Sequence, residues 1–550
     1  MNRLRVLLSV VRDPSLLRIE VAYLGFSMAE NGTWVAILVY AYSRGGAVAA
    51  GLVATIMLIP SAVIAPVAAY AGDRFRRDRV LVVGYVLQAV AMGATAGALF
   101  ADAPVWIVYT AATSAAVAVT VTRPAQNALL PSVTTTVEHL TAANATSGVV
   151  EGAGIFAGPF IAGVILSISE PGTVFAAFAA TSLVSAGLVA RLRLASGEAM
   201  PRIRMPIGEV ARQTLGGLSV LRRERDVRLI VLILSTGIVV VGALDVLYVA
   251  AAIDLLDLGD GGAGFLTSAF GIGGIFGAAA SVLLVGRRRL TPSMAAGSLT
   301  VGIPLVTLGV VPSAATAPAL FAAAGAGRSV ADVAGRTLLQ RIAPDEVLAR
   351  VFGALEGISM VSLAIGSAAA SVLIEAFGVD AALIVTGVVL PATLLLAWRR
   401  LLSIDREAVA PDEAVVSLLR GLPLFAPLPA PVIERLVANL IPVSVEPGTA
   451  FIVQGEPGDR FYVILEGQAD VTVDGMPISV ASTGDYVGEI ALLRDSPRTA
   501  SVTARTPMRV MALEREPFLQ AVTGHPQSRA AAETVVQERL GSTGSGPGVH

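Results

Sequence analysis

The first 400 residues consist of long apolar runs separated by short polar connections. A helix of about 20 apolar residues is long enough to cross the hydrocarbon core of a bilayer. Runs of that kind occur at 17–42, 46–71, 79–100, 104–130, 141–168, 172–191, 228–253, 261–286, 291–311, 315–339, 350–377 and 379–400. The pattern therefore predicts a polytopic α-helical membrane protein with 12 transmembrane helices.

The pattern changes near residue 403, where an acidic linker containing proline begins. After an amphipathic helical segment come short strands separated by Gly and Pro, which is typical of a small jelly roll, or β-roll. Phe461, Val463 and Leu465 occupy alternate positions, so each strand is expected to bury one face. A terminal helix is expected over 526–540.

The apolar part contains an internal repeat. RPAQNALLPSV, beginning at Arg123, resembles RTLLQRIAP, beginning at Arg336, and GVVEGAG around Glu151 resembles GALEGIS around Glu356. Repeated halves of this kind place a substrate site between them, near the middle of the membrane. The predicted parts are a six-helix half (1–191), an Arg-rich cytoplasmic loop (192–227), a second six-helix half (228–402), a linker (403–414), a soluble domain with flanking helices (415–541) and a disordered tail (542–550).

Composition agrees with a membrane protein and narrows its chemistry. The chain is 55% hydrophobic and 15% charged, whereas a soluble domain carries roughly 25% charged residues. There is no Cys, and all 39 basic residues are Arg. Thiolate chemistry, a Walker A lysine and Schiff-base chemistry are therefore excluded. We expect no enzymatic activity, no metal and no nucleic-acid partner.

Arginine distribution predicts the orientation, because positively charged loops stay in the cytoplasm. Arginines cluster at 74–79, 191–225, 287–289 and 399–400, and the opposite loops contain mainly Asp and Glu. We expect a multi-pass protein of a bacterial inner membrane with both termini in the cytoplasm. Residues 403–550 hold 18 acidic and 11 basic residues, net −7, and are expected to lie beneath the arginine clusters.

Several ionisable residues lie inside predicted spans, where each costs about 2.5 to 3.5 kcal/mol on insertion scales. Glu30, Asp245, Glu151 and Glu356 are candidates for a proton or substrate pathway, since buried carboxylates facing water can exchange protons. The alternative for each is a structural Glu–Arg pair across helices. Arg328 and Asp332 lie four residues apart on one helix face. They are further candidates for the pathway; alternatively, they simply neutralise each other.

Two motifs in this part resemble the major facilitator superfamily. AYAGDRFRRDRVL, from Ala69, is similar to its loop signature and matches it at Asp73, Arg74 and Arg77. GAGIFAGPFIAG, over 152–163, is similar to its antiporter helix motif, and the RPAQNALLP segment is similar to the drug- and siderophore-exporter branch. Asp73 lies at a cytoplasmic helix end beside arginines, and charge-assisted bonds there can hold one helix bundle against the other, so these three residues are candidates for gating. Alternatively, the arginines merely fix topology.

The soluble domain carries YVGEIALLRDSPRTASV over 486–502, which closely resembles the phosphate-binding cassette of cyclic-nucleotide-binding domains. The departure is Val487, where the family has Phe. The resemblance implies cAMP or cGMP as a regulatory ligand of a cytoplasmic cyclic-nucleotide-binding β-roll. It assigns nucleotide binding to Gly488, Glu489, Ala491, Arg498 and Thr499. The Arg498 guanidinium would contact phosphate, and Glu489 would accept from the ribose hydroxyl.

The predicted function is a secondary active transporter in the lipid bilayer, a proton-coupled exporter of a small molecule, regulated by a cyclic nucleotide. Two alternatives are a membrane receptor that no longer transports and a transporter of the nucleotide itself. A nucleotide-gated channel is disfavoured, because no filter-like TVGYG segment occurs.

Overall fold

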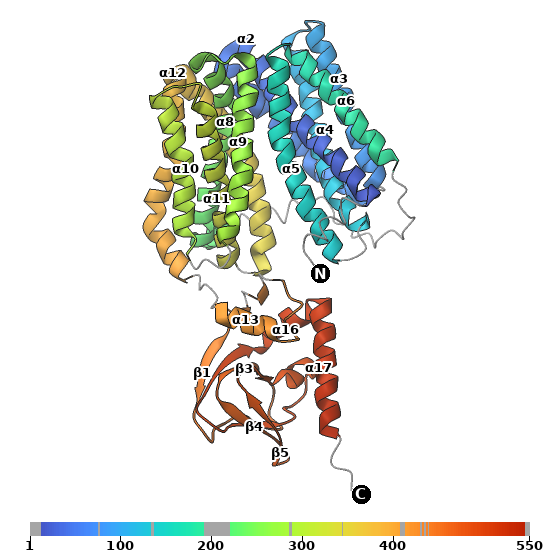
Figure 1. Ribbon diagram of the computed structural model, residues 1–550, viewed down its shortest axis with the longest axis vertical. Helices are drawn as coiled ribbons and strands as arrows, with labels where there is room; N and C mark the ends of the chain where they lie inside the picture. Colours follow the sequence, from blue (N-terminus) through green and yellow to red (C-terminus); the bar gives the residue numbers. More distant parts are fainter. Residues whose placement is uncertain are drawn as a thin grey trace. The chain divides into compact units, whose positions relative to one another are not determined.

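The structure is a computed structural model that describes residues 13–74, 77–133, 137–191, 220–284, 289–343, 345–407, 413–429, 432–433, 436–437 and 439–544. The chain divides into two compact units, with the boundary between Arg406 and Glu407 (Figure 1). The first unit is helical and the second is built mainly of strands.

The helical unit consists of two groups of long helices. The first group is α2 (Pro14–Arg74), α3 (Arg77–Phe100), α4 (Val105–Val133), α5 (Val137–Leu166) and α6 (Pro171–Ala190). The second is α8 (Arg225–Ala250) with the π-helical turn η1 (Ala251–Leu255), α9 (Gly259–Ala280) with the 3-10 turn η2 (Ser281–Leu284), α10 (Thr291–Val310), α11 (Ala317–Ile342) and α12 (Asp345–Glu407).

Glycine breaks two of these helices. In α2 the backbone is non-helical at Gly45 and Gly46, and Gly46 has φ +61°. In α12 it is non-helical at Gly378, which has φ +88°. Such φ values favour glycine because a side chain would be strained there. The breaks lie where the sequence pattern separates successive apolar runs.

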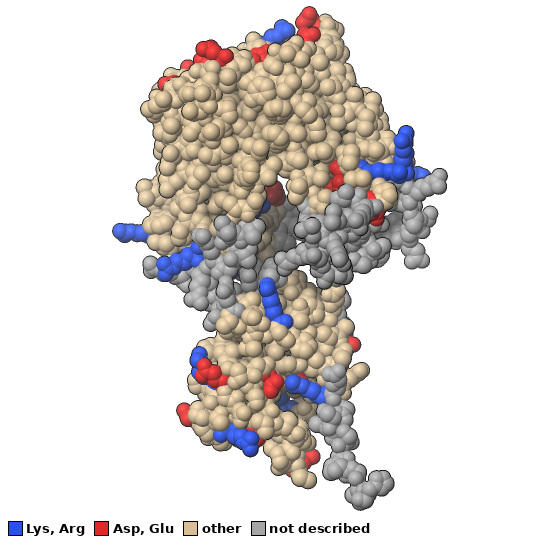
Figure 2. Space-filling view, in the orientation of Figure 1, with Lys and Arg blue, Asp and Glu red and all other residues tan. Residues whose placement is uncertain are grey.

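Among the residues that the structure describes, eight helices are long and apolar enough to cross a membrane, and the two broken helices are among them. On the face of the helical unit shown in the space-filling view, a broad band is uncharged and charged side chains gather at its two ends (Figure 2). The unit is therefore a multi-pass membrane domain. The count of 12 spans stays a prediction.

The helices of each group pack against one another. In the first, α3 packs against α4 and α6, and α2 against α4, α5 and α6. In the second, α11 packs against α9 and α10. The two groups meet where α5 contacts α9 and α2 contacts α8. Two halves that share one interface are the arrangement that the internal repeat predicts.

The second unit begins with α13 (Glu413–Gly421) and contains two antiparallel four-stranded sheets, ordered β1-β8-β3-β6 and β2-β7-β4-β5. The strands are β1 (Ile441–Val445), β2 (Ala450–Ile452), β3 (Arg460–Glu466), β4 (Gln468–Val473), β5 (Met476–Ser482), β6 (Tyr486–Val487), β7 (Ser501–Ala504) and β8 (Met508–Glu514). The helices are α15 (Glu489–Arg494), α16 (Arg515–Thr523) and α17 (Pro526–Gly544). The predicted β-roll with flanking helices is therefore present.

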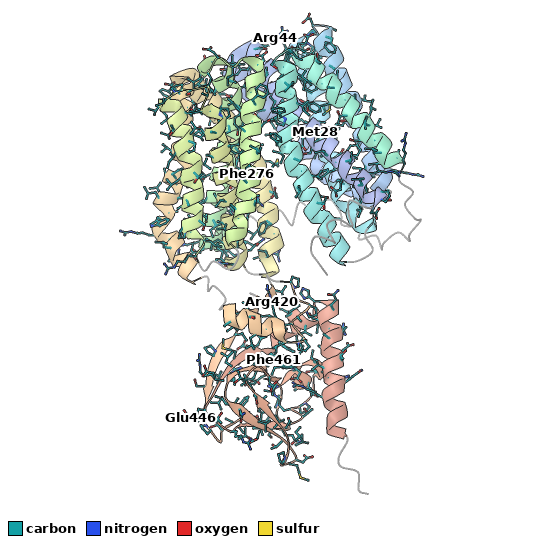
Figure 3. The ribbon with its side chains drawn as sticks, viewed as in Figure 1. Met28, Arg44, Phe276, Arg420, Glu446 and Phe461 are labelled. Atoms are coloured by element: carbon teal, nitrogen blue, oxygen red, sulfur yellow. The ribbon has the colours of Figure 1, made fainter. Side chains whose placement is uncertain are left out.

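The expectation that each strand buries one face is wrong for β3. Phe461 and Val463 lie in a core shared with the flanking helices, while Tyr462 and Ile464 lie in a second core between the sheets. Phe461 stacks on Phe518 of α16 with ring centroids 4.8 Å apart (Figure 3). Helices cover the outer face of β3, so it has no solvent face.

Candidate functional site

The β-roll encloses a cavity of about 410 Å³, within the range typical of small-molecule sites. Four segments supply its walls: the sheet of β4 and β5, the turn into α15, the residues before β7, and α17. The polar side chains that line it are Ser479, Asp485, Tyr486, Glu489, Arg498, Thr499 and Arg539. Gly488 and Ala491 line it as well, so all five residues that the sequence assigned to the nucleotide meet in one cavity.

Gly488 makes the sharp turn that brings α15 to the cavity. Its φ is +95°, and a Cβ atom there would lie 2.6 Å from Arg498 Nη1 and 2.9 Å from the Arg460 carbonyl oxygen. Conformation and space both require glycine at this position. The first backbone N–H groups of α15, among them that of buried Ala491, have no partner within the helix.

Arg498 is 5% exposed and is held from three sides. Nη1 donates to the Gly488 carbonyl at 2.9 Å, and Nη2 donates to the Arg460 carbonyl at 2.7 Å. Nη2 also lies 3.2 Å from Oδ1 of Asp459, a side chain that is 72% exposed. The exposed carboxylate is the contact that an incoming anion can replace, because it remains solvated when it leaves.

Glu489 is 1% exposed, and its two carboxylate oxygens differ. Oε1 accepts a hydrogen bond from Arg539 Nη1 at 2.7 Å, whereas Oε2 is buried without any hydrogen-bond partner. Burial raises the pKa of Glu489 above its ordinary value, although the charge of Arg539 acts in the opposite direction. A buried acceptor without a donor is costly, so Oε2 is suited to a ligand hydroxyl.

The sequence predicted the terminal helix, now α17, but not the role of Arg539. This residue bonds Glu489, donates to the Tyr486 carbonyl at 3.1 Å, and has its guanidinium carbon 4.4 Å from the centre of the Tyr486 ring. It therefore fastens the terminal helix to the cassette. The predicted helix contains two arginines, Arg529 and Arg539, but at a separation of 50 residues from Glu489 the sequence does not show which of them reaches the cavity.

In the membrane unit, Asp245 of α8 has its partner in the other half. The Trp34 side chain of α2 lies close enough to Asp245 to act as a hydrogen-bond donor to its carboxylate. Glu30 lies one helical turn before Trp34, so both candidate carboxylates are near this contact between the halves. Trp34 is not among the residues predicted from the sequence, because those predictions rest on ionisable side chains inside the spans.

Four of the charged residues in the second half form a chain of ion pairs. Arg328 Nη1 lies 3.1 Å from Asp332 Oδ1, and Arg336 Nε lies 2.9 Å from Asp332 Oδ2. Arg336 Nη1 reaches Glu356 Oε1 of α12 at 3.4 Å. Glu356 thus has the Glu–Arg pair across helices that was the structural alternative. Arg328 Nε is buried and has no hydrogen-bond partner.

The antiporter-like segment of α5 packs closely against α9 of the other half. A Cβ on Gly264 of α9 would lie 2.4 Å from the Pro159 carbonyl oxygen and 2.6 Å from Gly163 Cα. Near the same end, the Tyr42 hydroxyl of α2 donates to Asp254 of η1. Figure 2 shows a hollow between the halves at the opposite end. Glu151 contributes its carbonyl, which accepts from Ser27 Oγ at 3.3 Å.

The gating triplet spans the end of α2 and the start of α3. Helix α2 ends at Arg74 and α3 begins at Arg77, but the side chains of Asp73, Arg74 and Arg77 lie outside the described residues. The same holds for the Arg123 side chain and for residues 192–219, 408–412 and 545–550. Their predicted roles stay predictions.

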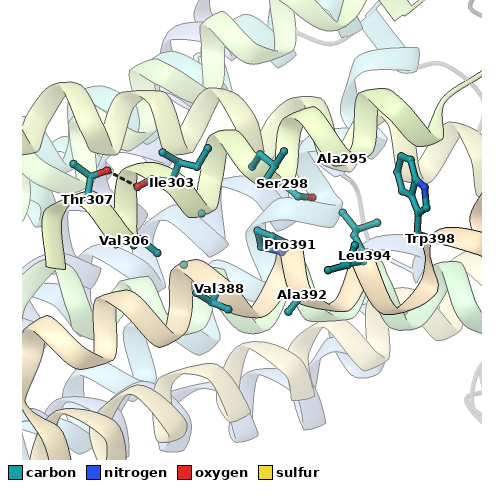
Figure 4. A pocket seen from close by; sticks show the side chains of 14 residues that line it. Ala295, Ser298, Ile303, Val306, Thr307, Val388, Pro391, Ala392, Leu394 and Trp398 are labelled. Atoms are coloured by element: carbon teal, nitrogen blue, oxygen red, sulfur yellow. Dashed lines mark hydrogen bonds between the residues drawn. The ribbon is translucent and has the colours of Figure 1, made fainter. Parts of the chain in front are cut away.

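A further groove of about 600 Å³ lies between α10 and α12 (Figure 4). Pro391 lies inside α12, and a proline there leaves a backbone carbonyl without its helical donor. The groove is lined by apolar side chains such as Ile303 and Leu395, together with Ser298, Thr307 and Trp398. It contains no ionisable group and none of the predicted pathway residues.

Two halves of apolar helices joined to a β-roll with an enclosed polar cavity define a membrane protein with a ligand-binding domain. Sequence comparison specifies both parts. The Major Facilitator Superfamily model matches residues 20–317 and 243–442, and the cyclic nucleotide-binding domain model matches 442–525. The chain belongs to the major facilitator superfamily and has a C-terminal cyclic-nucleotide-binding domain.

Similar curated proteins match the second unit. The cAMP-dependent protein kinase regulatory subunit of Yarrowia lipolytica is 43% identical over 102 residues, which is 18% of this chain and 27% of that protein. The same subunit of Aspergillus niger is 36% identical over 104 residues, 18% of this chain and 25% of that protein. The chain thus spans about a quarter of the length of these relatives.

Solved structures also resemble the second unit. The regulatory domain of Toxoplasma gondii protein kinase A with cAMP is 26% identical, covers 23% of this chain and 49% of that one, and has a TM-score of 0.21. The sensor domain of the regulator DNR from Pseudomonas aeruginosa is 22% identical, covers 23% of this chain and 92% of that one, and also has a TM-score of 0.21.

Proposed function

We propose that this protein is a secondary active transporter, a proton-coupled exporter of a small molecule, whose activity is regulated by cAMP or cGMP. The observation that carries the regulatory part is the β-roll cavity. It holds a buried guanidinium at Arg498 and a buried carboxylate oxygen without a donor at Glu489. A cyclic phosphate and a ribose hydroxyl supply the two groups that this pair requires.

Binding is proposed to proceed by exchange of partners. The cyclic phosphate takes the place of the exposed Asp459 carboxylate on Arg498 and accepts from the backbone N–H groups at the start of α15. The ribose 2′-hydroxyl donates to Glu489 Oε2. The relatives named as cAMP-dependent favour cAMP, while Thr499 in the cavity leaves cGMP as the alternative.

Proton coupling is proposed for Asp245. Its partner Trp34 belongs to the other half, so a change in the charge of Asp245 alters a contact that spans the interface. A ligand or proton shifts a conformational equilibrium only if it interacts differently with the two states. The transport direction, export, rests on the resemblance of helix α5 to antiporters.

Flux in proteoliposomes tests the proposal. Ethidium, a fluorescent lipophilic cation, serves as the transport probe, with and without a proton gradient and with cAMP or cGMP on either side. We expect gradient-driven flux whose rate changes with nucleotide in the wild type. In Arg498→Ala, nucleotide affinity should fall by about 30-fold or more, corresponding to about 2 kcal/mol.

Arg509→Ala is the matched control, because Arg509 is an exposed arginine of the same unit, and the ion pair that it forms is with exposed Glu466, away from the cavity. It should respond to nucleotide as the wild type does. Nucleotide binding without flux of any probe would favour the receptor alternative. Uptake of labelled cAMP itself would favour the nucleotide as cargo, and no binding of either nucleotide would refute regulation.

A further inference from the structure

A second groove runs along α12 on the side away from the apolar groove of Figure 4. It has a volume of about 680 Å³ and lies between the beginning of α8 and the end of α12. Its lining residues are Arg225, Asp226, Arg228, Leu229, Leu232, Leu396, Ala397 and Arg400. We refer to these eight residues as the arginine groove.

Charge in the arginine groove is unbalanced. Asp226 is occupied by Arg400, which donates from Nε and Nη2 to its two carboxylate oxygens, each at 2.8 Å. Arg225 and Arg228 are exposed and form no ion pair with any described residue. Three residues apart on α8, they lie on the same helix face. Because the charges of Asp226 and Arg400 cancel, the net charge of the groove is +2, from Arg225 and Arg228.

Below the arginines the groove is apolar. Leu232, one turn further along α8 from Arg228, is 56% exposed, and Leu396 of α12 is 90% exposed. Large apolar side chains this exposed on a helix that spans the membrane face lipid tails. Trp398, two residues after Leu396, has an amphipathic ring of the kind enriched at the membrane–water boundary. The arginines therefore stand at the depth of lipid headgroups, with leucines at the depth of the first acyl carbons.

We propose that the arginine groove binds one anionic phospholipid. The phosphate lies between the Arg225 and Arg228 guanidiniums, and an acyl chain follows Leu232 and Leu396 into the membrane. Basic pockets between helices on the side with positively charged loops recognise such headgroups. The bound lipid joins the first helix of the second half to its last helix.

Native mass spectrometry of the purified full-length protein tests this proposal, with phosphatidylglycerol and phosphatidylcholine of identical acyl chains as probes. We expect the wild type to retain phosphatidylglycerol at least fivefold more than phosphatidylcholine. Arg225→Gln combined with Arg228→Gln should remove that preference. Both side chains are exposed, and glutamine has a helix propensity close to that of arginine, so folding is preserved.

Arg399→Gln is the matched control, since Arg399 is exposed beside Arg400 but does not line the groove. It should retain the preference for phosphatidylglycerol. Leu396→Ser should weaken retention of phosphatidylglycerol. Equal retention of the two lipids, or an unchanged preference in the double variant, would overturn the proposal. Displacement of the lipid by an equal concentration of inorganic phosphate would also overturn it, because the site would then bind a free anion.

Discussion

Glu489 is buried, and one of its carboxylate oxygens accepts a hydrogen bond while the other has no donor. We therefore expect nucleotide affinity to depend on pH. Burial raises the pKa of free Glu489 above its ordinary 4.5. A hydrogen bond donated by a ribose hydroxyl to Oε2 stabilises the ionised carboxylate of Glu489, so nucleotide binding favours release of its proton. Affinity should therefore fall as pH is lowered through the raised pKa, by up to about tenfold per unit. Calorimetric titration of the full-length protein with cAMP at several pH values measures this.

Glu489→Gln is the control for that titration. The amide cannot ionise, so its affinity should be lower and independent of pH over the same range. Folding stability depends on pH in the opposite direction to nucleotide affinity. The contribution of Glu489 to the free energy of unfolding is present below pH 4.5 and is lost as pH rises through the raised pKa. A wild-type affinity that does not vary with pH would contradict the assignment of Oε2 to the ribose.

Asp245 should decide whether transport follows the proton gradient. The chain has no lysine for a Walker A site, so we predict that an ion gradient drives transport; one charge moved through 100 mV supplies about 2.3 kcal/mol. Asp245→Asn keeps an acceptor for the Trp34 side chain but cannot carry a proton. Proton-driven flux of ethidium should be abolished, while exchange without a gradient persists. Flux in this variant that still follows the gradient would exclude Asp245 as the coupling residue.

At the residue scale, the sequence predicted the functional residues that lie within one short motif. It did not predict the residues that other helices place against them. Gly488, Glu489, Ala491, Arg498 and Thr499 fall within twelve positions, and they line one cavity. Arg539 comes from a helix 50 residues away, and Trp34 comes from the other half of the membrane unit. Such partners depend on tertiary packing, which no local spacing encodes.

Helices α5 and α9 approach so closely at Gly163 and Gly264 that any side chain on Gly264 would collide with backbone. Gly264→Ala should therefore separate the halves at this end and favour a conformation open there. The chain has no Cys, so spin labels can be placed on introduced cysteines alone. Exposed Ser43 and Asp257, one in each half, are suitable positions. The distance between these labels should increase in the variant.

Gly187→Ala in α6 is the matched control, because a Cβ there would meet nothing within 4 Å. It should leave the distance between labels unchanged. An unchanged distance in Gly264→Ala would show that this contact does not hold the two halves together.

At the element scale, apolar periodicity anticipated helices better than strands. The breaks at Gly45, Gly46 and Gly378 fall where one apolar run ends and the next begins. Alternation failed for β3, whose Phe461 and Tyr462 face different cores. A strand covered by helices on one side and by a sheet on the other has no polar face to reveal it.

The joining of transporter and binding domain in one chain predicts reciprocal coupling. If a nucleotide shifts the balance between two transporter conformations, locking either conformation must change nucleotide affinity by the same factor. Disulfide cross-links between introduced cysteines, at either end of the interface between the halves, provide the two locked forms. Titration with cAMP should give different affinities for them. Equal affinities would leave the β-roll as a domain that binds nucleotide without affecting transport.

At the scale of the whole molecule, composition and the repeat were sufficient to predict a membrane unit in two halves followed by a soluble β-roll. Both parts are present and match their families. The arginine groove was not predicted, because it forms between the first residues of α8 and the last turns of α12, about 170 positions apart. Only the packing of these two helices brings Arg400 to Asp226.

The proximity of Trp34 to Asp245 also gives the protein an intrinsic optical reporter. The chain has three tryptophans, and Trp106 is 69% exposed while Trp398 lines the apolar groove. Replacing those two with Phe leaves an indole whose excited state is sensitive to a neighbouring carboxylate. Separation of the halves would change its emission wavelength and lifetime. The opening and closing of an unlabelled transporter could then be followed in real time, during turnover, by its own fluorescence.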